Sequence, residues 1–309
     1  MKKLENEKIK VSKSTKLKKD KSTIIFNIVG YFIVVIFSLF CVIPFIIMVS
    51  GSISNEQEIV KHGYSILPRG FSLEAYKTIF KYPDQIIRAY GVTTAVTVIG
   101  TVLGLLLTSM AGYVLARKDF KSRNTISFLI YFTTLFGGGL VPWYLVLTQI
   151  LHLKNSYWGL IIPGLLTPFL IFLFKNFLSS VPDSLIESAR IDGANDFYIY
   201  WKIVLPLAKP ALATIGLFTA LSYWNNWFYT SILITDTKKY SLQYLLYNIL
   251  QNSQFMQQQS LAGAASVVNP PTETVKLATA IIVTGPVILF YPFAQKYFVE
   301  GLTIGGVKG

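Results

Sequence analysis

Long uncharged segments alternate with short polar ones along this chain. Six long segments contain no Asp, Glu, Lys or Arg. Each has about 20 residues or more, the length that a helix needs to cross a hydrocarbon core about 30 Å thick. They cover residues 22–55, 89–116, 124–153, 155–174, 210–235 and 277–295. The pattern predicts an all-α integral membrane protein with six transmembrane helices.

Local residues refine these segments. The first is longer than one span needs, so its helix is expected to tilt or to end near Gly51. Only Lys154 separates the third segment from the fourth, which predicts a tight hairpin between them. Three consecutive glycines at 137–139, followed by Pro142, predict close packing or a kink inside the third segment.

The distribution of lysine and arginine predicts the orientation. If the N-terminus lies inside, four segments face the cytoplasm: 1–21, 117–123, 175–209 and 296–309. In this order they hold nine, four, four and two basic residues, which is 19 of the 28 in the chain. The outward segments 51–88, 152–154 and 236–276 hold the other nine. This excess follows the positive-inside rule, so both termini are predicted to be cytoplasmic.

The composition supports a membrane location. Hydrophobic residues make up 52% of the chain, charged residues only 14%, and the mean hydropathy is +0.51, whereas soluble domains carry about 25% charged residues. The net charge of +13 follows from the topology, and the basic residues 1–21 suit an anionic lipid surface better than a nucleic acid. The lone cysteine, Cys41, lies in an apolar run and is expected to be buried without a disulfide partner.

Segment 175–209 is a polar stretch between the fourth and fifth predicted spans. Its residues predict a short helix, a sharp turn and a second helix that leads back to the membrane. The signals are Pro182, Asp183 and Ser184 at the first helix start, Gly193 at a left-handed turn, Asn195 or Asp196 as the second cap, and Pro206 and Pro210 at the second helix end.

The same segment carries a family motif. Its spacing of Glu187, Ala189, Gly193, Ile203, Leu205 and Pro206 resembles the EAA loop of permease subunits of ATP-binding-cassette importers. Ser188 stands where a second alanine is usual, a small-for-small exchange. The resemblance implies a coupling helix that enters a cleft of a separate ATPase subunit. On spacing alone, an ordinary amphipathic connector remains the alternative.

The resemblance implies a set of ATPase-coupling residues. Small residues allow close approach, and the carboxylate of Glu187 is expected to pair with a basic residue of the ATPase. The coupling residues are Glu187, Ser188, Ala189, Asp192, Gly193, Ala194, Leu205 and Pro206.

Other stretches resemble the carbohydrate-uptake branch of these permeases, of the maltose type and nearest to permeases for complex oligosaccharides. They are Leu135–Val146, Trp158–Gly164, Leu205–Thr214 and Trp224–Trp227. The closing Gly301–Gly309 is similar to a tail that reaches the ATPase subunits in that family, which implies contacts from Gly305, Gly306, Val307 and Lys308. A frayed terminus is the alternative.

The resemblance also implies an architecture. A peripheral first helix at 22–55 precedes a five-helix type I importer core at 89–295, which contains the coupling loop 175–209. Expected partners are a second homologous permease, two ATPase subunits, an external solute-binding protein, a carbohydrate and the lipid bilayer. The chain is expected to bind no cofactor itself, because ATP and Mg would be bound by the ATPase, and to work in the bacterial cytoplasmic membrane as a translocation subunit, not as an enzyme.

Polar and aromatic residues within the spans are candidates for handling the solute. Aromatic faces stack on sugar rings and amides bond to hydroxyls. The tentative pathway residues are Trp224, Asn225, Asn226, Trp227, Trp143 and Tyr144. For the tryptophans, an outer aromatic belt at the membrane interface is an equal alternative. In the maltose-type family that the chain resembles, the loop at the position of 236–276 contacts the external solute-binding protein. A polar loop without a role is the alternative for this segment.

Absences weigh against other functions. The chain lacks G-x-x-x-x-G-K-[ST], so it has no phosphate-binding loop of its own. An ion-coupled secondary transporter usually needs ionisable groups at membrane depth, and the six predicted spans contain no acidic residue, Lys or Arg. A membrane-embedded enzyme would need converging catalytic groups. An importer for a solute other than a sugar remains the main alternative.

Overall fold

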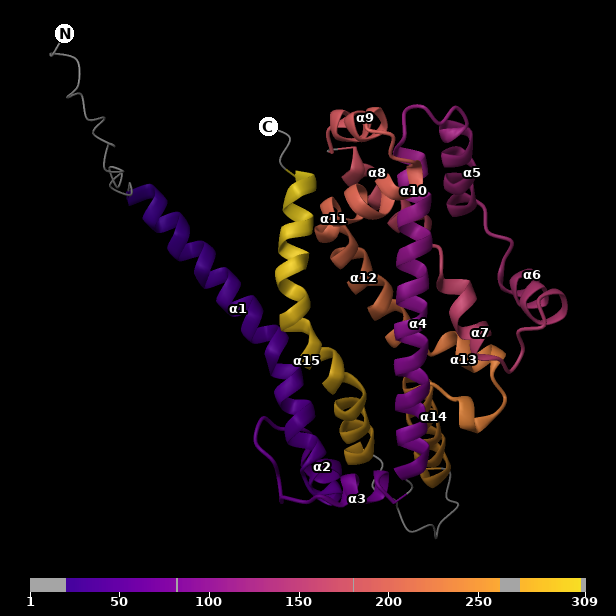
Figure 1. The fold of residues 1–309 in the computed structure, drawn as a ribbon. Helices are drawn as coiled ribbons and strands as arrows, with labels where there is room; N and C mark the ends of the chain where they lie inside the picture. Colours follow the sequence, from indigo (N-terminus) through magenta and orange to yellow (C-terminus); the bar gives the residue numbers. More distant parts are fainter. Residues whose placement is uncertain (1–20, 82, 180, 262–272, 307–309) are drawn as a thin grey trace.

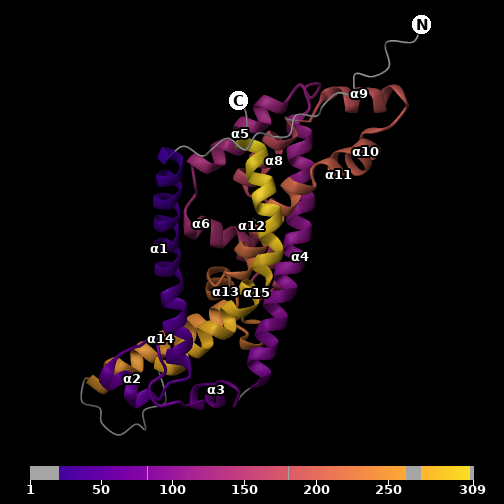
Figure 2. The ribbon, with the colours of Figure 1, turned by 90° about the vertical axis from the view of Figure 1, so that its left-hand side faces the viewer.

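The computed structural model describes residues 21–306 except residues 82, 180 and 262–272. In this part of the chain the structure is helical, with one isolated bridge between Ser54 and Phe71. Figure 1 shows long, steep helices with shorter ones gathered around them, and Figure 2 shows the same arrangement from the side. The prediction of an all-α fold is confirmed.

The α-helices are α1 (Lys21–Ser52), α2 (Glu56–His62), α3 (Glu74–Ile79), α4 (Pro83–Ala116), α5 (Arg123–Leu135), α6 (Leu140–Leu145), α7 (Tyr157–Ile161), α8 (Pro168–Leu178), α9 (Asp183–Ile191), α10 (Asp196–Ile199), α11 (Leu205–Leu207), α12 (Lys209–Trp224), α13 (Phe228–Leu233), α14 (Leu242–Leu261) and α15 (Glu273–Gly306). Two π-helical turns, η1 (Val146–Ile150) and η3 (Tyr200–Val204), and two 3-10 turns, η2 (Ile162–Gly164) and η4 (Thr237–Lys239), complete the set.

Among the described residues, two helices are by themselves long and apolar enough to cross a membrane. They are α1, which ends at Ser52, one residue beyond the expected stop, and α4, which begins earlier than predicted. The early start of α4 follows from Pro83 and Asp84, a proline and an acidic residue that favour a helix N-terminus. α15 covers the sixth predicted segment and continues past residue 295 to Gly306.

Three other pairs of helical segments are bent. The axis turns by 114° between α5 and α6–η1, by 47° between α7–η2 and α8, and by 82° between α10–α11 and α12. The last of these bends lies where the predicted loop 175–209 meets the fifth predicted span. The first bend confirms the kink predicted at the glycines, because Gly139 adopts a φ of +85°. If each bent pair is one span, up to five segments of the described residues are long and apolar enough to cross a membrane.

The prediction of one uninterrupted helix over 210–235 is wrong. α12 ends at Trp224, and α13 begins only at Phe228. The segment stays uncharged through the break, and Asn225 and Asn226 interrupt its apolar run too briefly for hydropathy to reveal the break. The following outward segment is also not a plain loop, because it contains η4 and the 20-residue helix α14.

α4 runs along the length of the bundle (Figures 1 and 2) and packs against both α12 and α8. Glycines allow this close approach. A Cβ on Gly100 would lie 2.5 Å from the ring of Tyr223, and one on Gly112 would lie 2.8 Å from the ring of Phe174. Both distances are far below ordinary contact, so side chains at these two positions would force the helices apart.

α1 stands at the periphery, and its N-terminal end diverges from the neighbouring α15 (Figure 1). Its C-terminal end is fixed through α2, where both oxygens of Glu56 accept hydrogen bonds from the backbone N–H groups of Glu273 and Thr274 at 2.9 Å. The carboxylate thus caps α15 from another helix. Cys41 is exposed on α1, contrary to expectation, because the apolar surface of this helix is largely uncovered.

Candidate functional site

Segment 175–209 forms the predicted helix–turn–helix. α9 begins after Pro182, and Gly193 adopts the left-handed conformation with a φ of +84°. The side chain of Asn195 then accepts a hydrogen bond from the backbone N–H of Tyr198 at 2.8 Å and caps α10. Pro206 differs from expectation, since it lies inside α11, and the chain bends two residues later at Ala208.

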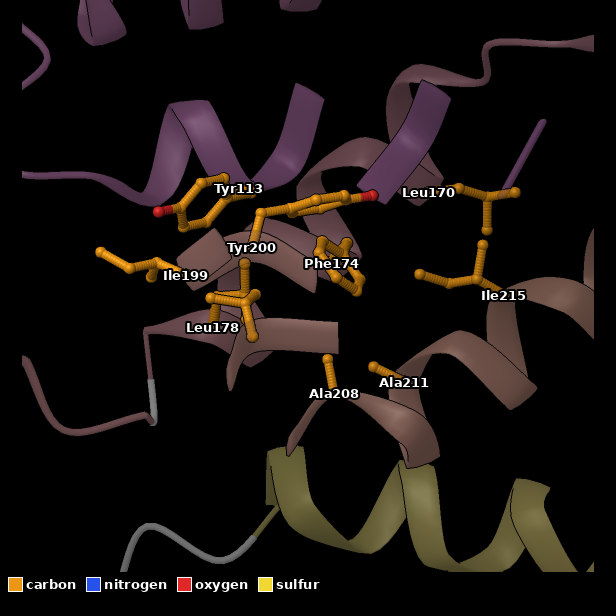
Figure 3. Packing of buried hydrophobic residues seen from close by; sticks show 10 residues of the cluster. Tyr113, Leu170, Phe174, Leu178, Ile199, Tyr200, Ala208, Ala211 and Ile215 are labelled. Atoms are coloured by element: carbon orange, nitrogen blue, oxygen red, sulfur yellow. The ribbon is translucent and has the colours of Figure 1, made fainter. Parts of the chain in front are cut away.

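The second half of this element is seated on a buried apolar cluster (Figure 3). Ile199, Tyr200 and Val204 are almost fully buried, and they belong to α10 and η3. The cluster contains residues from α4, α8 and α12 as well: Tyr113, Leu170, Phe174, Leu178, Ala208, Ala211 and Ile215. Any displacement of α10 and η3 must therefore act on the ends of three other helices.

The outer half of the element is exposed. The side chain of Glu187 makes no hydrogen bond or ion pair with any residue that the structure describes. The hydroxyl of Ser188 donates to the carbonyl of Ser184 at 2.7 Å, so the serine is satisfied at a position where alanine is usual. Ile191 and Phe197 are 87% and 68% exposed. A free carboxylate beside exposed apolar side chains is typical of a surface that another protein covers.

The eight coupling residues predicted from the motif fall into two groups. Most lie at the α9–α10 tip, where the backbone N–H of Ala194 donates to the carbonyl of Ala189 at 2.9 Å and closes the turn. Ala189, Ala194 and Leu205 all pack against the buried cluster, and Pro206 follows Leu205 in α11. The motif thus contributes exposed residues at the tip, such as Glu187, and apolar residues that hold the element on the cluster.

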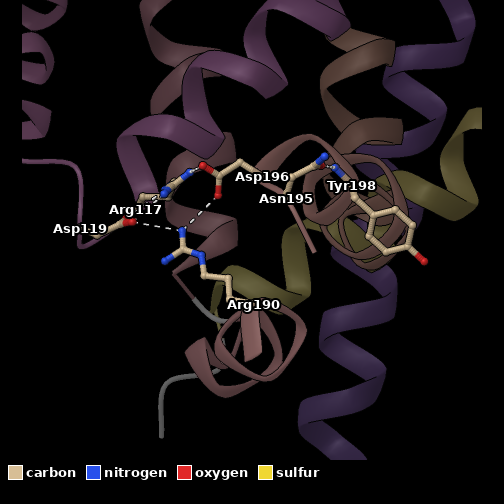
Figure 4. Close-up of polar contacts among 6 residues, drawn as sticks. All are labelled: Arg117, Asp119, Arg190, Asn195, Asp196 and Tyr198. Carbon is tan, nitrogen blue, oxygen red and sulfur yellow. Dashed lines mark hydrogen bonds and ion pairs between the residues drawn. The ribbon is translucent and has the colours of Figure 1, made fainter. Parts of the chain in front are cut away.

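Sequence reasoning missed an ion-pair cluster beside this element (Figure 4). Arg117 and Asp119, which follow α4, meet Arg190 of α9 and Asp196 of α10. Hydrogen bonds from Arg117 hold the pKa of both carboxyls, Asp119 and Asp196, below the usual range. The only sequence signal is that both segments are charged and predicted to face the same side of the membrane.

The pathway residues of the fifth predicted span lie at the helix break, and Trp224 has an internal role there. Its indole N–H donates to the carbonyl of Val283 at 3.3 Å, and its ring lies 6.5 Å from that of Tyr90. These contacts join α12 to α15 and α4. Trp224 is therefore half-buried between helices of this chain.

The next three residues turn toward α13 and α14. The side-chain oxygen of Asn225 accepts from Gln243 at 3.2 Å, and that of Asn226 accepts from the backbone N–H of Tyr229 at 2.9 Å. Trp227 stacks on Tyr247 with ring centroids 4.4 Å apart. A cavity beside Asn226 has a volume of only about 10 Å³, enough for one water and too small for a sugar.

An aromatic row at the start of α14 extends this group. Tyr244 stacks with Tyr247 at 6.2 Å, and Tyr240, which precedes the helix, meets Tyr244 edge-on at 4.7 Å. The three-residue spacing of Tyr244 and Tyr247 is that of one helix face, a signal that could have been recognised. Trp143 also joins the group by packing 5.4 Å from Tyr229, and the backbone carbonyl of Tyr144 accepts a hydrogen bond from Thr148 at 2.8 Å.

The predicted ATPase-contacting tail is described in part. Gly305 and Gly306 end α15. Val307 and Lys308 lie outside the described residues.

Broken apolar helices packed on a long continuous span, with an exposed helix–turn–helix seated on three helix ends, define a membrane permease. Residues 21–304 match the model of a family described as "Binding-protein-dependent transport system inner membrane component". The chain belongs to this family. It is therefore a transport permease of the cytoplasmic membrane, and proteins of this family are not enzymes.

Individual proteins to which the chain is similar are also named as transport system permeases. The chain is 42% identical to the polygalacturonan/rhamnogalacturonan transport system permease protein YtcP of Bacillus subtilis (strain 168), over 92% of this chain and 99% of that one. It is 31% identical to the arabinooligosaccharides transport system permease protein AraQ of the same organism, over 88% and 92%.

The fold also has a solved counterpart. A chain from a bacterial ABC transporter involved in the import of the acidic polysaccharide alginate superposes with a TM-score of 0.76 and 33% sequence identity, covering 90% of this chain and 98% of that chain. The predicted type I ABC importer permease fold is confirmed.

Proposed function

We propose that this chain is the membrane subunit of an ATP-driven importer that carries an oligosaccharide into the cell. Family membership and the names of the similar proteins support the class of substrate. The observation that carries the mechanism is the exposed α9–α10 tip on a base shared with α4, α8 and α12. An element of this shape can receive movement from a second protein and pass it to the helices.

ATP hydrolysis belongs to a separate ATPase chain, which docks on the tip. Glu187 pairs with a basic side chain of that ATPase, and Ser188, Asp192, Gly193 and Ala194 allow close approach. Leu205 and Pro206 keep the tip on its base. ATP and Mg are bound by the ATPase, and this chain binds no cofactor. The absence of a phosphate-binding loop from the sequence supports this division.

Transport proceeds by alternating access. Closure of two ATPase subunits displaces α9–α10, and the buried apolar cluster on which this element packs passes the displacement to the membrane helices. A second, homologous permease forms the other half of the pathway, and an external solute-binding protein delivers the sugar to the outer side. Both termini and the tip face the cytoplasm, with the tail from Gly305 to Lys308 against the ATPase.

The sugar pathway passes the aromatic group at the break between α12 and α13. Trp227 and the tyrosines of α14 offer ring faces, and Asn225 and Gln243 offer amides for hydroxyls. A neutral lining of this kind suits glycans. Since the cavity beside Asn226 holds no more than a water, we place the sugar between this surface and the second permease.

Replacement of Glu187 by lysine tests the coupling. In the complete transporter reconstituted in proteoliposomes, Glu187→Lys should uncouple ATP hydrolysis from uptake of a labelled oligogalacturonate. The new lysine would face the basic side chain of the ATPase that pairs with Glu187 in the proposal, and the two cations would repel each other. Glu74→Lys, which reverses an exposed carboxylate at the start of α3, is the matched control and should leave both rates unchanged. Uptake by this chain alone, driven by a proton gradient, would overturn the proposal.

A further inference from the structure

The ion-pair cluster of Arg117, Asp119, Arg190 and Asp196 joins two segments that are distant in the sequence. In Figure 4 the four side chains point toward one another. The first two residues follow α4 directly, Arg190 lies in the last turn of α9, and Asp196 begins α10. The chain itself connects the α9–α10 element to α8 on one side and to α12 on the other. The cluster adds a third connection, to α4.

The four charges form a closed ring in which each arginine contacts both aspartates. Arg117 uses three nitrogens: its Nε and Nη2 contact Asp119 at 2.9 and 2.6 Å, and its Nη1 contacts Asp196 at 2.8 Å. Arg190 uses one nitrogen, its Nη2, which lies 3.1 Å from Asp119 and 3.2 Å from Asp196. A network with a bidentate arginine holds its geometry better than an isolated surface pair.

Packing below the ring continues the connection along one face of α4. Ser109, Tyr113 and Arg117 are spaced four residues apart, so they share that face. Ser109 and Tyr113 both contact Tyr200 of η3, through a hydrogen bond of 2.7 Å and a ring separation of 5.6 Å. The guanidinium of Arg117 lies 5.9 Å from the centre of the Tyr113 ring. The last turns of α4 are thus held to the element side by side.

We infer that these four residues form a clamp that makes the α9–α10 element and the end of α4 move as one body during transport. The inference rests on the proposed function, in which the ATPase displaces that element. α4 runs along the length of the bundle and packs on both α12 and α8. Without the clamp, the tip could shift against α4, and part of each ATPase stroke would be lost before it reached that helix.

The two arginines should respond differently to lysine. At position 190 a single ammonium can replace the single nitrogen that bridges both carboxylates. At position 117 a lysine cannot supply the fork that three contacts require. Arg190→Lys should therefore keep the clamp, and Arg117→Lys should break it. A role limited to positive charge would make the two substitutions equivalent.

The direct test measures the distance across the clamp in the assembled transporter. Spin labels are placed at Val114→Cys on α4 and Tyr198→Cys on α10, both exposed, in a Cys41→Ser background. Pulsed electron resonance is recorded without nucleotide and with ATP and vanadate. The original clamp and Arg190→Lys should give the same distance in both states. Arg117→Lys should give a distance that changes or broadens with nucleotide.

The second readout is ATP hydrolysis and its stimulation by the cognate solute-binding protein. Loss of the clamp should reduce the stimulation about fivefold or more, because coupling between two linked sites typically changes an equilibrium by about 5- to 150-fold. Asp196→Asn, which keeps the side-chain shape, is measured in parallel in case Arg117→Lys does not assemble. Arg88→Lys is the control, because Arg88 makes an exposed pair with Asp84 at 3.9 Å in another part of α4.

Glu187→Lys in the same preparation separates the two proposals. If it abolishes the stimulation while Arg117→Lys and Asp196→Asn match the original protein in distance and stimulation, the clamp is wrong and the docking of the ATPase stands. If Glu187→Lys leaves stimulation and ATPase binding intact, the proposed function fails, and the clamp fails with it because no ATPase stroke would pass through the tip.

Discussion

Ser109 and Tyr200 share a buried hydrogen bond of 2.7 Å that joins α4 to the π-helical turn η3. Tyr200→Phe removes this bond but keeps the ring on Tyr113, and Ser109 still donates to the carbonyl of Leu106 at 3.0 Å. The loss should be about 1 kcal/mol. Tyr200→Ala also empties the buried site and should cost about 3 kcal/mol or more.

Thermal unfolding of the purified complex in detergent measures both Tyr200 variants. The expected order is the original protein, then Tyr200→Phe, then Tyr200→Ala. Equal midpoints for the two variants would show that the ring contributes nothing to the stability of the buried cluster.

Two glycines of α4 should respond to alanine in opposite ways. A Cβ at position 112 would meet Phe174 at 2.8 Å and the carbonyl of Ile171 at 3.1 Å, whereas a Cβ at Gly91 would meet nothing within 4 Å. Gly112→Ala should therefore destabilise the bundle by about 1 to 3 kcal/mol. Gly91→Ala should leave stability unchanged or raise it by up to about 1 kcal/mol, because alanine favours a helix. Unfolding midpoints in one detergent check the contrast, and similar losses at both positions would contradict it.

Low pH should weaken the ion-pair cluster. Hydrogen bonds from Arg117 lower the pKa of Asp119 and of Asp196 in the folded chain, and the unfolded pKa is about 3.9. A carboxyl with a lowered folded pKa contributes stability that is present above its unfolded pKa and is lost as the pH falls toward its folded pKa. The contribution should be constant from neutral pH to about pH 4.5 and decline below about pH 4.

A comparison of variants isolates this effect from other acid-sensitive groups. The difference in unfolding midpoint between the original protein and Asp119→Asn/Asp196→Asn should be measurable but modest at pH 7, because both carboxylates are about half exposed, and should shrink below about pH 4. Asp84→Asn, at an exposed carboxylate 3.9 Å from Arg88, should show a small difference throughout. A difference for the double variant that does not depend on pH would show that the carboxylates act by shape, not by charge.

The sequence predicted what local chemistry determines. The turn at Gly193 and the cap at Asn195 depend on a backbone conformation and a hydrogen bond within three residues, so both could be read from the chain. The exposed position of Glu187 followed from the polar character of its segment. The eight motif residues were identified together, although only the structure showed that Leu205 belongs to the base.

Contacts between distant segments could not be predicted. The pairing of Arg117 with Asp196 depends on how α4 packs against η3, and no spacing in the sequence records that packing. The break at Asn225 was missed for another reason, since apolar residues continue on both sides and hydropathy reports burial in lipid, not helix continuity. The role of Trp224 depends on Val283, a residue of another helix.

The two tryptophans at that break should separate stability from transport. Trp224 is half-buried and bridges three helices, so Trp224→Ala should cost about 3 kcal/mol or more and lower the unfolding midpoint. Trp227 is 39% exposed and stacks mainly on Tyr247, a ring pair worth about 0.5 to 1.5 kcal/mol. Trp227→Ala should therefore leave the midpoint nearly unchanged while reducing uptake of a labelled oligogalacturonate. Trp227→Phe, which keeps a ring for stacking, should restore part of that uptake, because a flat apolar face and not the indole N–H would contact the sugar. If Trp227→Ala transports normally, or if Trp227→Phe is as poor as Trp227→Ala, the aromatic row of α14 is not part of the sugar pathway and only holds the outer helices together.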